Sequence, residues 1–457
     1  MLLSIVVPII PDILYQLDNG STQIHLAIDT EEKGYNASFS IKDDGKYQNG
    51  THNSSYHNRY RTFNYDMNNE NSNVGLLLAS KAIVQLLMNP ILGPMTNRMG
   101  SKSPMFFGTI VLFISSIMFA YGNTFNILFA ARSIHGVGSS CITIGGFSMI
   151  ADRYPEDKKR SKIMGFIMGG TATGVLVGYP LGSVMYDFVN QSTPFLIVAS
   201  LLLVNTVLIY IFLHPRLEPE RLLVGASIRK LILDPYIIVA SGAICMSAFT
   251  IAVLEPALPI WLMESMSPPK WQLGTVFIPD SFGYFVGTNF FGIVALKMGR
   301  WLTAMISLLT VGVCAITIPL STHVLQLVIP HFGLGLGIGV IDASLMPLMA
   351  HLVDTRYTAL YGSVYAVAEI AVCLAYSIGP LLGGYLVKIM GFSWVMRFFG
   401  ILNLLYCPLC LFLKDIPLLE NEKMAINMKD VDNMNAKASL TTEGRTNYAS
   451  FTNEEDK

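Results

Sequence analysis

Long apolar segments separated by short polar ones make up most of the chain. Eleven of them have the length and apolar character of membrane-spanning helices, which need about 20 residues. We expect these helices at 74–96, 104–121, 126–150, 163–186, 194–213, 235–262, 272–296, 302–320, 324–350, 361–387 and 393–413. Residues 1–17 carry a shorter apolar run, which we interpret as the distal part of a first span. The pattern predicts an all-α membrane protein whose first helix is incomplete.

Two long polar segments interrupt this pattern. Segment 18–73 is rich in Asn, Ser, Tyr and Asp and contains glycosylation sequons at Asn36, Asn49 and Asn53. Three acceptor sites in one segment predict a glycosylated loop that faces a lumen or the exterior. The tail 415–457 has no apolar periodicity, so we expect it to be disordered and cytosolic.

Basic residues are concentrated in alternate loops. With 18–73 on the lumenal side, the cytosolic loops are 97–103, 152–162, 214–234, 297–301 and 351–360. They hold 14 Lys and Arg, whereas the short lumenal connections hold Lys270 and Lys388. Positive residues favour the cytosolic side of a membrane protein. Charge and sequons therefore predict the same orientation.

An internal repeat predicts how the helices are grouped. Asn97–Gly100 follows one span, and Lys297–Arg300 follows another about 200 residues later. The runs beginning at His135 and Gly178 have counterparts that begin at Gly333 and Gly379, at a similar offset. We expect an N-terminal bundle (1–213), a cytosolic linker (214–234) and a C-terminal bundle (235–414). Two parallel six-helix repeats describe the major facilitator fold, whose substrate site lies between the halves near the membrane midplane.

Composition excludes several classes of protein. Apolar residues make up 52% and charged residues 13%, too few charges for an ordinary soluble domain. The net charge of −1 gives no indication of nucleic-acid binding. The six cysteines lie in apolar segments, and no metal-ligand or phosphate-binding motif occurs. We expect no enzyme activity, no metal and no cofactor, and a monomer whose partners are lipid and transported ions.

Five ionisable residues lie deep inside the expected spans, where each costs about 2.5–3.5 kcal/mol to insert. They are Lys81, Arg132, Glu255, Asp342 and Glu369. A surplus of acids in such a cavity suits an ammonium substrate and proton binding. A structural ion pair is the alternative for Lys81, Asp342 and Glu369, and a snorkelling role is the alternative for Arg132.

The residues inside the spans differ in how strongly the sequence supports a function for them. Glu255 is flanked by Pro256 and Pro259, which free backbone carbonyls and widen a cavity, so it is the strongest candidate to face a ligand. We interpret Asp280 as a hydrated end residue and His135 as a packing histidine. The aromatic residues could stack on a cation or only fill space: Trp261, Phe277, Tyr284 and Tyr376. A run of small residues packs helices closely and also resembles the signature of proton antiporters: Gly174, Gly178, Pro180 and Gly182.

Longer motifs give a specific resemblance. The runs Leu254–Trp261, Lys270–Gly274, Gly287–Asn289 and Tyr361–Ala366 resemble the vesicular monoamine transporter family. The resemblance implies exchange of lumenal protons for cytosolic serotonin, dopamine, noradrenaline or histamine across a secretory or synaptic vesicle membrane. It implies that Glu255 pairs with the substrate ammonium.

The same resemblance assigns further roles. It implies a proton-coupled charge network of Lys81, Arg132, Asp342 and Glu369. It implies a substrate pocket lined by Asn89, Val175, Ile251, Tyr284 and Tyr376, and gating aromatics at the lumenal side, Phe277 and Trp261.

The chain also departs from the family pattern. The family carries a functional Asp just before the residues that match Met1–Leu3, so we expect the chain as given not to transport. Glu369 stands where the family has Asp. Three alternatives stay open: a vesicular acetylcholine transporter, a broader drug–proton antiporter, and a truncated isoform that regulates without transporting.

Overall fold

The computed structural model describes residues 52–190, 192–213, 228–266, 275–357 and 360–415. These residues fold into helices, with no strand among them, which confirms the all-α class. The α-helices are α2 (His52–Met99), α3 (Lys102–Tyr121), α4 (Phe125–Arg153), α5 (Asp157–Phe188), α6 (Thr193–Leu213), α7 (Ile228–Ile232), α8 (Pro235–Ser265), α10 (Ile278–Met298), α11 (Arg300–Thr317), α12 (Val328–Arg356), α13 (Gly362–Met390) and α14 (Phe392–Tyr406). Short 3-10 segments complete three spans: η1 (Ile318–Leu320), η2 (Val324–Leu327) and η3 (Cys407–Leu413).

Each of the eleven expected spans overlaps one of these α-helices. Nine of the described helices are long and apolar enough to cross a membrane. α5 and α10 are not among these nine, but both pack inside the same bundle. α10 begins at Ile278, later than predicted, with Pro279 in its first turn, where proline is tolerated. The first partial span lies outside the described residues.

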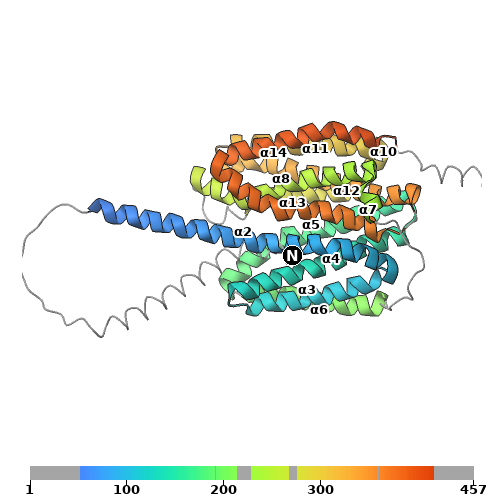
Figure 1. Cartoon of the computed structure of the whole chain (residues 1–457), viewed down its shortest axis with the longest axis horizontal. Helices are drawn as coiled ribbons and strands as arrows, with labels where there is room; N and C mark the ends of the chain where they lie inside the picture. Colours follow the sequence, from blue (N-terminus) through green and yellow to red (C-terminus); the bar gives the residue numbers. More distant parts are fainter. Residues whose placement is uncertain (1–51, 191, 214–227, 267–274, 358–359, 416–457) are drawn as a thin grey trace, which may run out of the picture.

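The prediction of a loop over 18–73 is wrong for its last third. Residues 52–73 continue α2 as a helix that projects beyond the bundle (Figure 1). This stretch contains no proline or glycine, and extending an existing helix costs far less than starting one. Residues 18–51 lie outside the described residues.

Glycine ends several helices and explains the repeated sequence. Gly100 between α2 and α3 has φ 79°, and Gly299 between α10 and α11 has φ 94°. This left-handed backbone region strongly favours glycine, because other residues clash there. Both glycines belong to the repeated motif found in the sequence. The repeat therefore marks the same sharp turn in each half.

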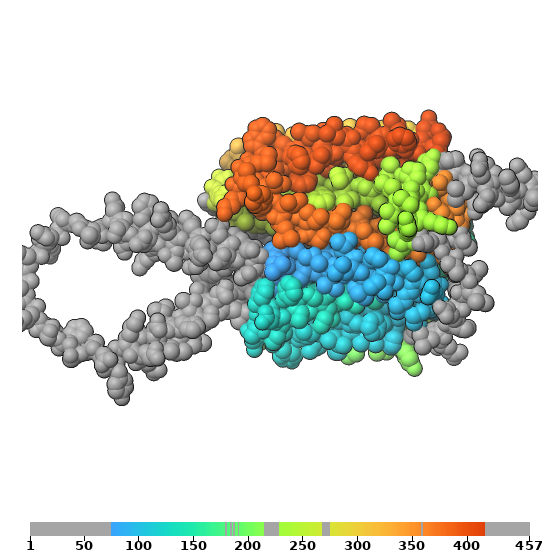
Figure 2. Space-filling model, viewed as in Figure 1, coloured from blue at the N-terminus to red at the C-terminus, as the bar shows by residue number. Residues whose placement is uncertain are grey.

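The helices form two groups that lie face to face. Helices α2 to α6 make one group and α8 to α14 the other, as the two colour ranges in Figure 2 show. The groups meet mainly where α2 packs on α13 and α5 packs on α10. This arrangement agrees with the two predicted halves, whose boundaries stay a prediction.

One end of the bundle is rich in cations and is called the basic end here. It carries residues that join consecutive helices, among them Lys102, Arg153, Arg300 and Arg356. Near this end the two halves approach at glycines: a methyl group added at Gly362 would lie 2.5 Å from the carbonyl oxygen of Gly93. Backbone contact this close is possible only without side chains. The halves are therefore sealed together at the basic end.

Candidate functional site

Buried charges of opposite sign meet at the boundary between the halves. The first half contributes cations, Lys81 on α2 and Arg132 on α4, and Arg132 is only 2% exposed. The second half contributes acids, and Glu369 on α13 is only 7% exposed. Lys81 lies within electrostatic range of Arg132, Glu255 and Glu369. Because a charge in a membrane interior needs a partner, this cluster is the strongest candidate for a functional site.

Polar residues of α2 and α13 line the middle of this boundary. Gln85 Nε2 donates a 3.3 Å hydrogen bond to Glu369 Oε2. Asn89 Nδ2 contacts the Cys373 sulfur at 3.6 Å, and its Oδ1 accepts a 2.7 Å bond from Ser140 on α4. On α2 these residues follow Lys81 at intervals of four, so they share one face of the helix. That face points at the acid of the other half.

The remaining acids lie within the second half. The Tyr284 hydroxyl on α10 donates a 2.9 Å hydrogen bond to Asp342 Oδ2 on α12. Glu369 and Tyr376 lie within electrostatic range of the same hydroxyl. Glu255 on α8 lies within range of both Lys81 and Arg132. The structure therefore brings together the five charges expected inside the spans and the expected pocket residues Asn89, Tyr284 and Tyr376.

Other expected site residues lie apart from this centre or are packed. Ile251 is 6% exposed and belongs to the apolar core, and Val175 is partly exposed on α5. The two expected gating aromatics contact rings within their own half: Trp261 stacks on Phe392 at 4.7 Å, and Phe277 meets His331 edge-on at 6.4 Å. Their roles stay predictions.

Two further sets of expected residues have only a partial structural account. The small-residue run lies along α5: Gly174, Gly178, Pro180 and Gly182. Of the sequons, Asn53 lies at the start of α2, whereas Asn36 and Asn49 lie outside the described residues. Within the described ranges, no group of three His, Cys, Asp or Glu could hold a metal.

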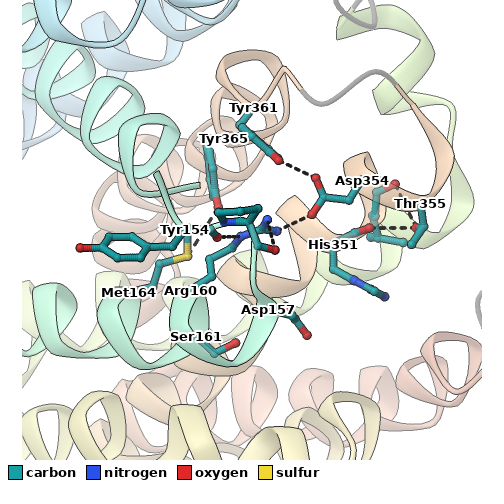
Figure 3. Close-up of polar contacts among 12 residues, drawn as sticks. Tyr154, Asp157, Arg160, Ser161, Met164, His351, Asp354, Thr355, Tyr361 and Tyr365 are labelled. Atoms are coloured by element: carbon teal, nitrogen blue, oxygen red, sulfur yellow. Dashed lines mark hydrogen bonds and ion pairs between the residues drawn. The ribbon is translucent and has the colours of Figure 1, made fainter. Parts of the chain in front are cut away.

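A second polar cluster, at the basic end, was missed by the sequence analysis. Figure 3 shows Arg160 of α5 reaching across to Asp354 of α12, with Nη1 2.6 Å from Oδ2. The Arg160 side chain is 1% exposed and that of Asp354 is 28% exposed. Arg160 also donates to the carbonyls of Tyr154 and Pro155 at 3.0 and 3.2 Å. This buried, multiply bonded guanidinium fastens the two halves at the basic end.

Neighbouring contacts strengthen that connection. Tyr361 donates a 2.5 Å bond to Asp354 Oδ1. The Tyr365 hydroxyl lies 3.5 Å from the Met164 sulfur of the other half. The cluster therefore combines charge, hydrogen bonding and packing.

Two more contacts join the halves near the basic end. Arg300 Nη2 lies 2.6 Å from Asp157 Oδ1 and 3.0 Å from Ser161 Oγ. Asn97 accepts a 2.8 Å bond from the Gly362 amide and donates a 2.9 Å bond to Ser363. The sequence does carry a signal for these contacts, because Asp157 and Arg160 place opposite charges one turn apart at the start of α5. Counting Lys and Arg in each loop hides this signal, because that count uses Arg160 only to assign the loop to the cytosolic side.

Comparison with known proteins identifies the class. The model of the Major Facilitator Superfamily matches residues 3–368 and 240–442. The structure of a human organic anion transporter matches with a TM-score of 0.67 at 16% identity, covering 89% of this chain and 95% of that one. At that identity the likeness shows the fold alone. Two helical halves around buried charges define a major facilitator transporter, which is not an enzyme.

More similar sequences narrow this class. The synaptic vesicular amine transporter of Bos taurus is 45% identical over 457 residues, covering 94% of this chain and 88% of its own. The chromaffin granule amine transporter of Homo sapiens is 48% identical over 79% of this chain and 69% of its own. The vesicular acetylcholine transporter of Torpedo torpedo is 38% identical over 76% of this chain and 69% of its own. The chain belongs to the vesicular amine transporter family of the Major Facilitator Superfamily.

Proposed function

We propose that this protein is a proton-coupled antiporter that loads monoamines from the cytosol into acidic secretory or synaptic vesicles. The substrate class is that of serotonin, dopamine, noradrenaline and histamine. The amine transporters named above support the substrate class, and their vesicular names support the location.

The observation that carries the proposal is the division of charge between the halves. The cations Lys81 and Arg132 lie on one side of the boundary, and the acids Glu255, Asp342 and Glu369 lie on the other. A protonated amine can compete with the cations for an acid, and a proton can neutralise that acid. Both exchanges alter the attraction between the halves. Transport by alternating access requires such a link between ligand binding and the relative position of the two halves.

The residues then take distinct roles in this proposal. Glu255 pairs with the substrate ammonium, while Lys81, Arg132, Asp342 and Glu369 form the charge network coupled to protons, in which the acids bind and release the proton. Gln85 is added to that network because it donates directly to Glu369. Asn89, Val175, Ile251, Tyr284 and Tyr376 line the pocket.

The structure represents one state of the cycle under this proposal. Assigning the basic end to the cytosol follows the positive-inside rule and agrees with a lumenal position for the sequons. Arg160–Asp354, Arg300–Asp157 and the Asn97 contacts then close the cytosolic side. Amine bound at the centre would therefore have no cytosolic exit in this conformation.

Uptake of serotonin into proteoliposomes with an acidic interior tests the proposal, with the chain extended at its N-terminus through the Asp that the family carries there. We expect accumulation that a proton uncoupler abolishes and that other monoamines inhibit. A matched Glu255→Gln protein should remain monodisperse but not accumulate serotonin. Uncoupler-resistant uptake, or inhibition by acetylcholine or unrelated drugs in preference to monoamines, would contradict it.

A further inference from the structure

Two buried polar atoms on neighbouring helices lack hydrogen-bond partners among the described residues. They are Asp280 Oδ1 on α10 and His331 Nε2 on α12. His331 is completely buried, with 0% exposure. Its Nδ1 lies 3.1 Å from the carbonyl oxygen of Leu327. A carbonyl only accepts, so Nδ1 carries the hydrogen, and the Nε2 of the neutral ring presents a lone pair.

The two helices place these atoms in the same region. The Phe277 ring, one turn before Asp280, meets the His331 ring edge-on at 6.4 Å. Gly335 packs directly on Asp280: a methyl group there would lie 2.8 Å from Asp280 Oδ1 and overlap the Asp280 carbonyl. His331 and Gly335 are four residues apart and share one face of α12. Asp280 therefore lies about one helical turn, roughly 5.4 Å along the axis, from His331.

Within the described residues, neither acceptor receives a hydrogen bond. A buried carboxylate oxygen without a donor is destabilising, and an unpaired imidazole nitrogen adds to that destabilisation. One hydrogen between the two groups, directly or through a bridging water, satisfies both. Proton binding is therefore the change that removes the unsatisfied atoms.

The charged surroundings are compatible with such a proton. Glu255 on α8 lies within electrostatic range of Asp280. The Tyr284 hydroxyl, one turn further along α10, already donates its hydrogen bond to Asp342 of α12. From α11 the nearest titratable group is the Cys314 thiol, which packs on Gly333. α5 also packs on α10. Its described contacts there lie toward the basic end, away from Asp280: Gly165 with Thr288 and Gly169 with Asn289. Lys388 on α13 and Glu264 on α8 are exposed.

We propose that Asp280 and His331 form a second proton-binding site, at the end of the bundle opposite the basic end. It is separate from the charge network around Lys81. This inference rests on the proposed function, in which that end faces the acidic lumen. A proton from the lumen binds the Asp280 carboxylate and is shared with His331 Nε2. One O–H bond forms at the Asp280 carboxylate and one breaks in the hydronium ion that delivers the proton, and the new hydroxyl donates a hydrogen bond to His331 Nε2.

The site lies on a part of the fold that can transmit its state. α10 and α12 are packed almost backbone to backbone: a methyl group at Gly283 would lie 2.2 Å from the Phe332 carbonyl oxygen. The pair therefore moves as a unit. α10 also packs on α5 of the other half. Protonation of Asp280 therefore alters how α10 packs on α5 of the other half, and transport depends on lumenal pH.

The test measures serotonin uptake at fixed external pH by the reconstituted chain, extended at its N-terminus as in the test of the proposed function. Internal pH is varied between about 5 and 8, the range in which histidine titrates. The parent is compared with Asp280→Asn, His331→Gln and the double variant. Glu264→Gln is the control, because it removes an exposed acid at the same end of the bundle. Infrared difference spectra of the purified proteins across the same pH range report protonated buried carboxyl groups without requiring transport.

We expect each single variant to move the midpoint of the internal-pH profile by about one pH unit, which is a tenfold change in proton affinity. The double variant should match the singles, since both groups bind one proton. Asp280→Asn should remove one carboxyl band, and Glu264→Gln should change neither measurement. Unchanged profiles together with an unchanged spectrum in Asp280→Asn would overturn the inference. A parent without uncoupler-sensitive uptake would refute the proposed function, and the infrared titration would still decide on the site.

Discussion

The ion pair between Arg160 and Asp354 gives the most direct test of how the two halves are held together. Replacing Asp354 by Asn keeps the shape of the side chain and removes its charge. The 2.6 Å contact then becomes a bond to a neutral acceptor. The Tyr361 hydroxyl can still donate to position 354, and Arg160 keeps its bonds to the carbonyls of Tyr154 and Pro155. The substitution therefore weakens a single interaction between the halves.

The size of the effect follows from the geometry. A hydrogen bond to a charged group contributes about 1.5–3 kcal/mol, and the remaining partners place this loss near 2 kcal/mol. At about 1.4 kcal/mol per factor of ten, the equilibrium shifts about thirtyfold toward opening of the basic end.

A cysteine introduced at Ser148 reports this opening. Ser148 is 2% exposed on α4 and lines a small cavity between the halves with Asn97 and Tyr361. Its rate of reaction with a membrane-impermeant maleimide follows the fraction of open molecules when closing is fast. The labelling rate of the same chain without the cysteine at position 148 is subtracted, because it reports reaction at the native cysteines. Asp354→Asn should accelerate labelling about thirtyfold.

The control is the pair Lys159 and Glu156, which lies 2.8 Å apart on the surface of the same region. It connects residues of one half only, and its side chains are 68% and 54% exposed. Glu156→Gln should leave the labelling rate unchanged. Equal rates in the parent and in Asp354→Asn would refute the reasoning, because the pair would then contribute nothing to closure.

Three further predictions follow from the same contacts. Glu255→Gln should weaken amine binding by at least about 2 kcal/mol, or thirtyfold, without changing thermal stability, as measured by ligand binding and a melting curve. Neutralising Lys81 or Glu369 alone should cost up to about 3–5 kcal/mol and neutralising both should cost less than the sum, so a double-mutant cycle in uptake with zero coupling would reject their pairing. Gly362→Ala should lower stability by about 1–3 kcal/mol because its methyl group meets Gly93 and Asn97, and an unchanged melting temperature would contradict the observed packing.

Much of the fold could be predicted from local properties of the chain. Apolar length determines a membrane helix by itself, because backbone groups in lipid must be paired within the segment. The repeat predicted two halves because Gly100 and Gly299 meet the same backbone requirement at equivalent turns. The helix boundary at Ile278 and the helical stretch 52–73 were missed. The position of Pro279 decided where α10 begins, and propagation of an existing helix extended α2 over 52–73. The length of an apolar segment predicts neither boundary.

The charged centre could also be predicted, because a charge inside an apolar segment is conspicuous wherever it lies. The sequence identified Lys81, Arg132, Glu255, Asp342 and Glu369 one at a time. It could not show that the cations of one half and the acids of the other meet at one place on the boundary between them. Nor could it select Gln85, which is an ordinary polar residue until α13 brings Glu369 to within 3.3 Å.

Only the tertiary structure decided the two remaining features. Arg160 and Asp354 are 194 residues apart, and in the sequence each lies beside other charged residues near a loop. Asp280 was interpreted as a hydrated end residue, yet its Oδ1 is buried beside Gly335. The sequence by itself determined which segments enter the membrane and which residues are costly there, since both depend on local hydrophobicity. The structure determined which of those residues share a partner, because that depends on the packing of helices distant in the chain.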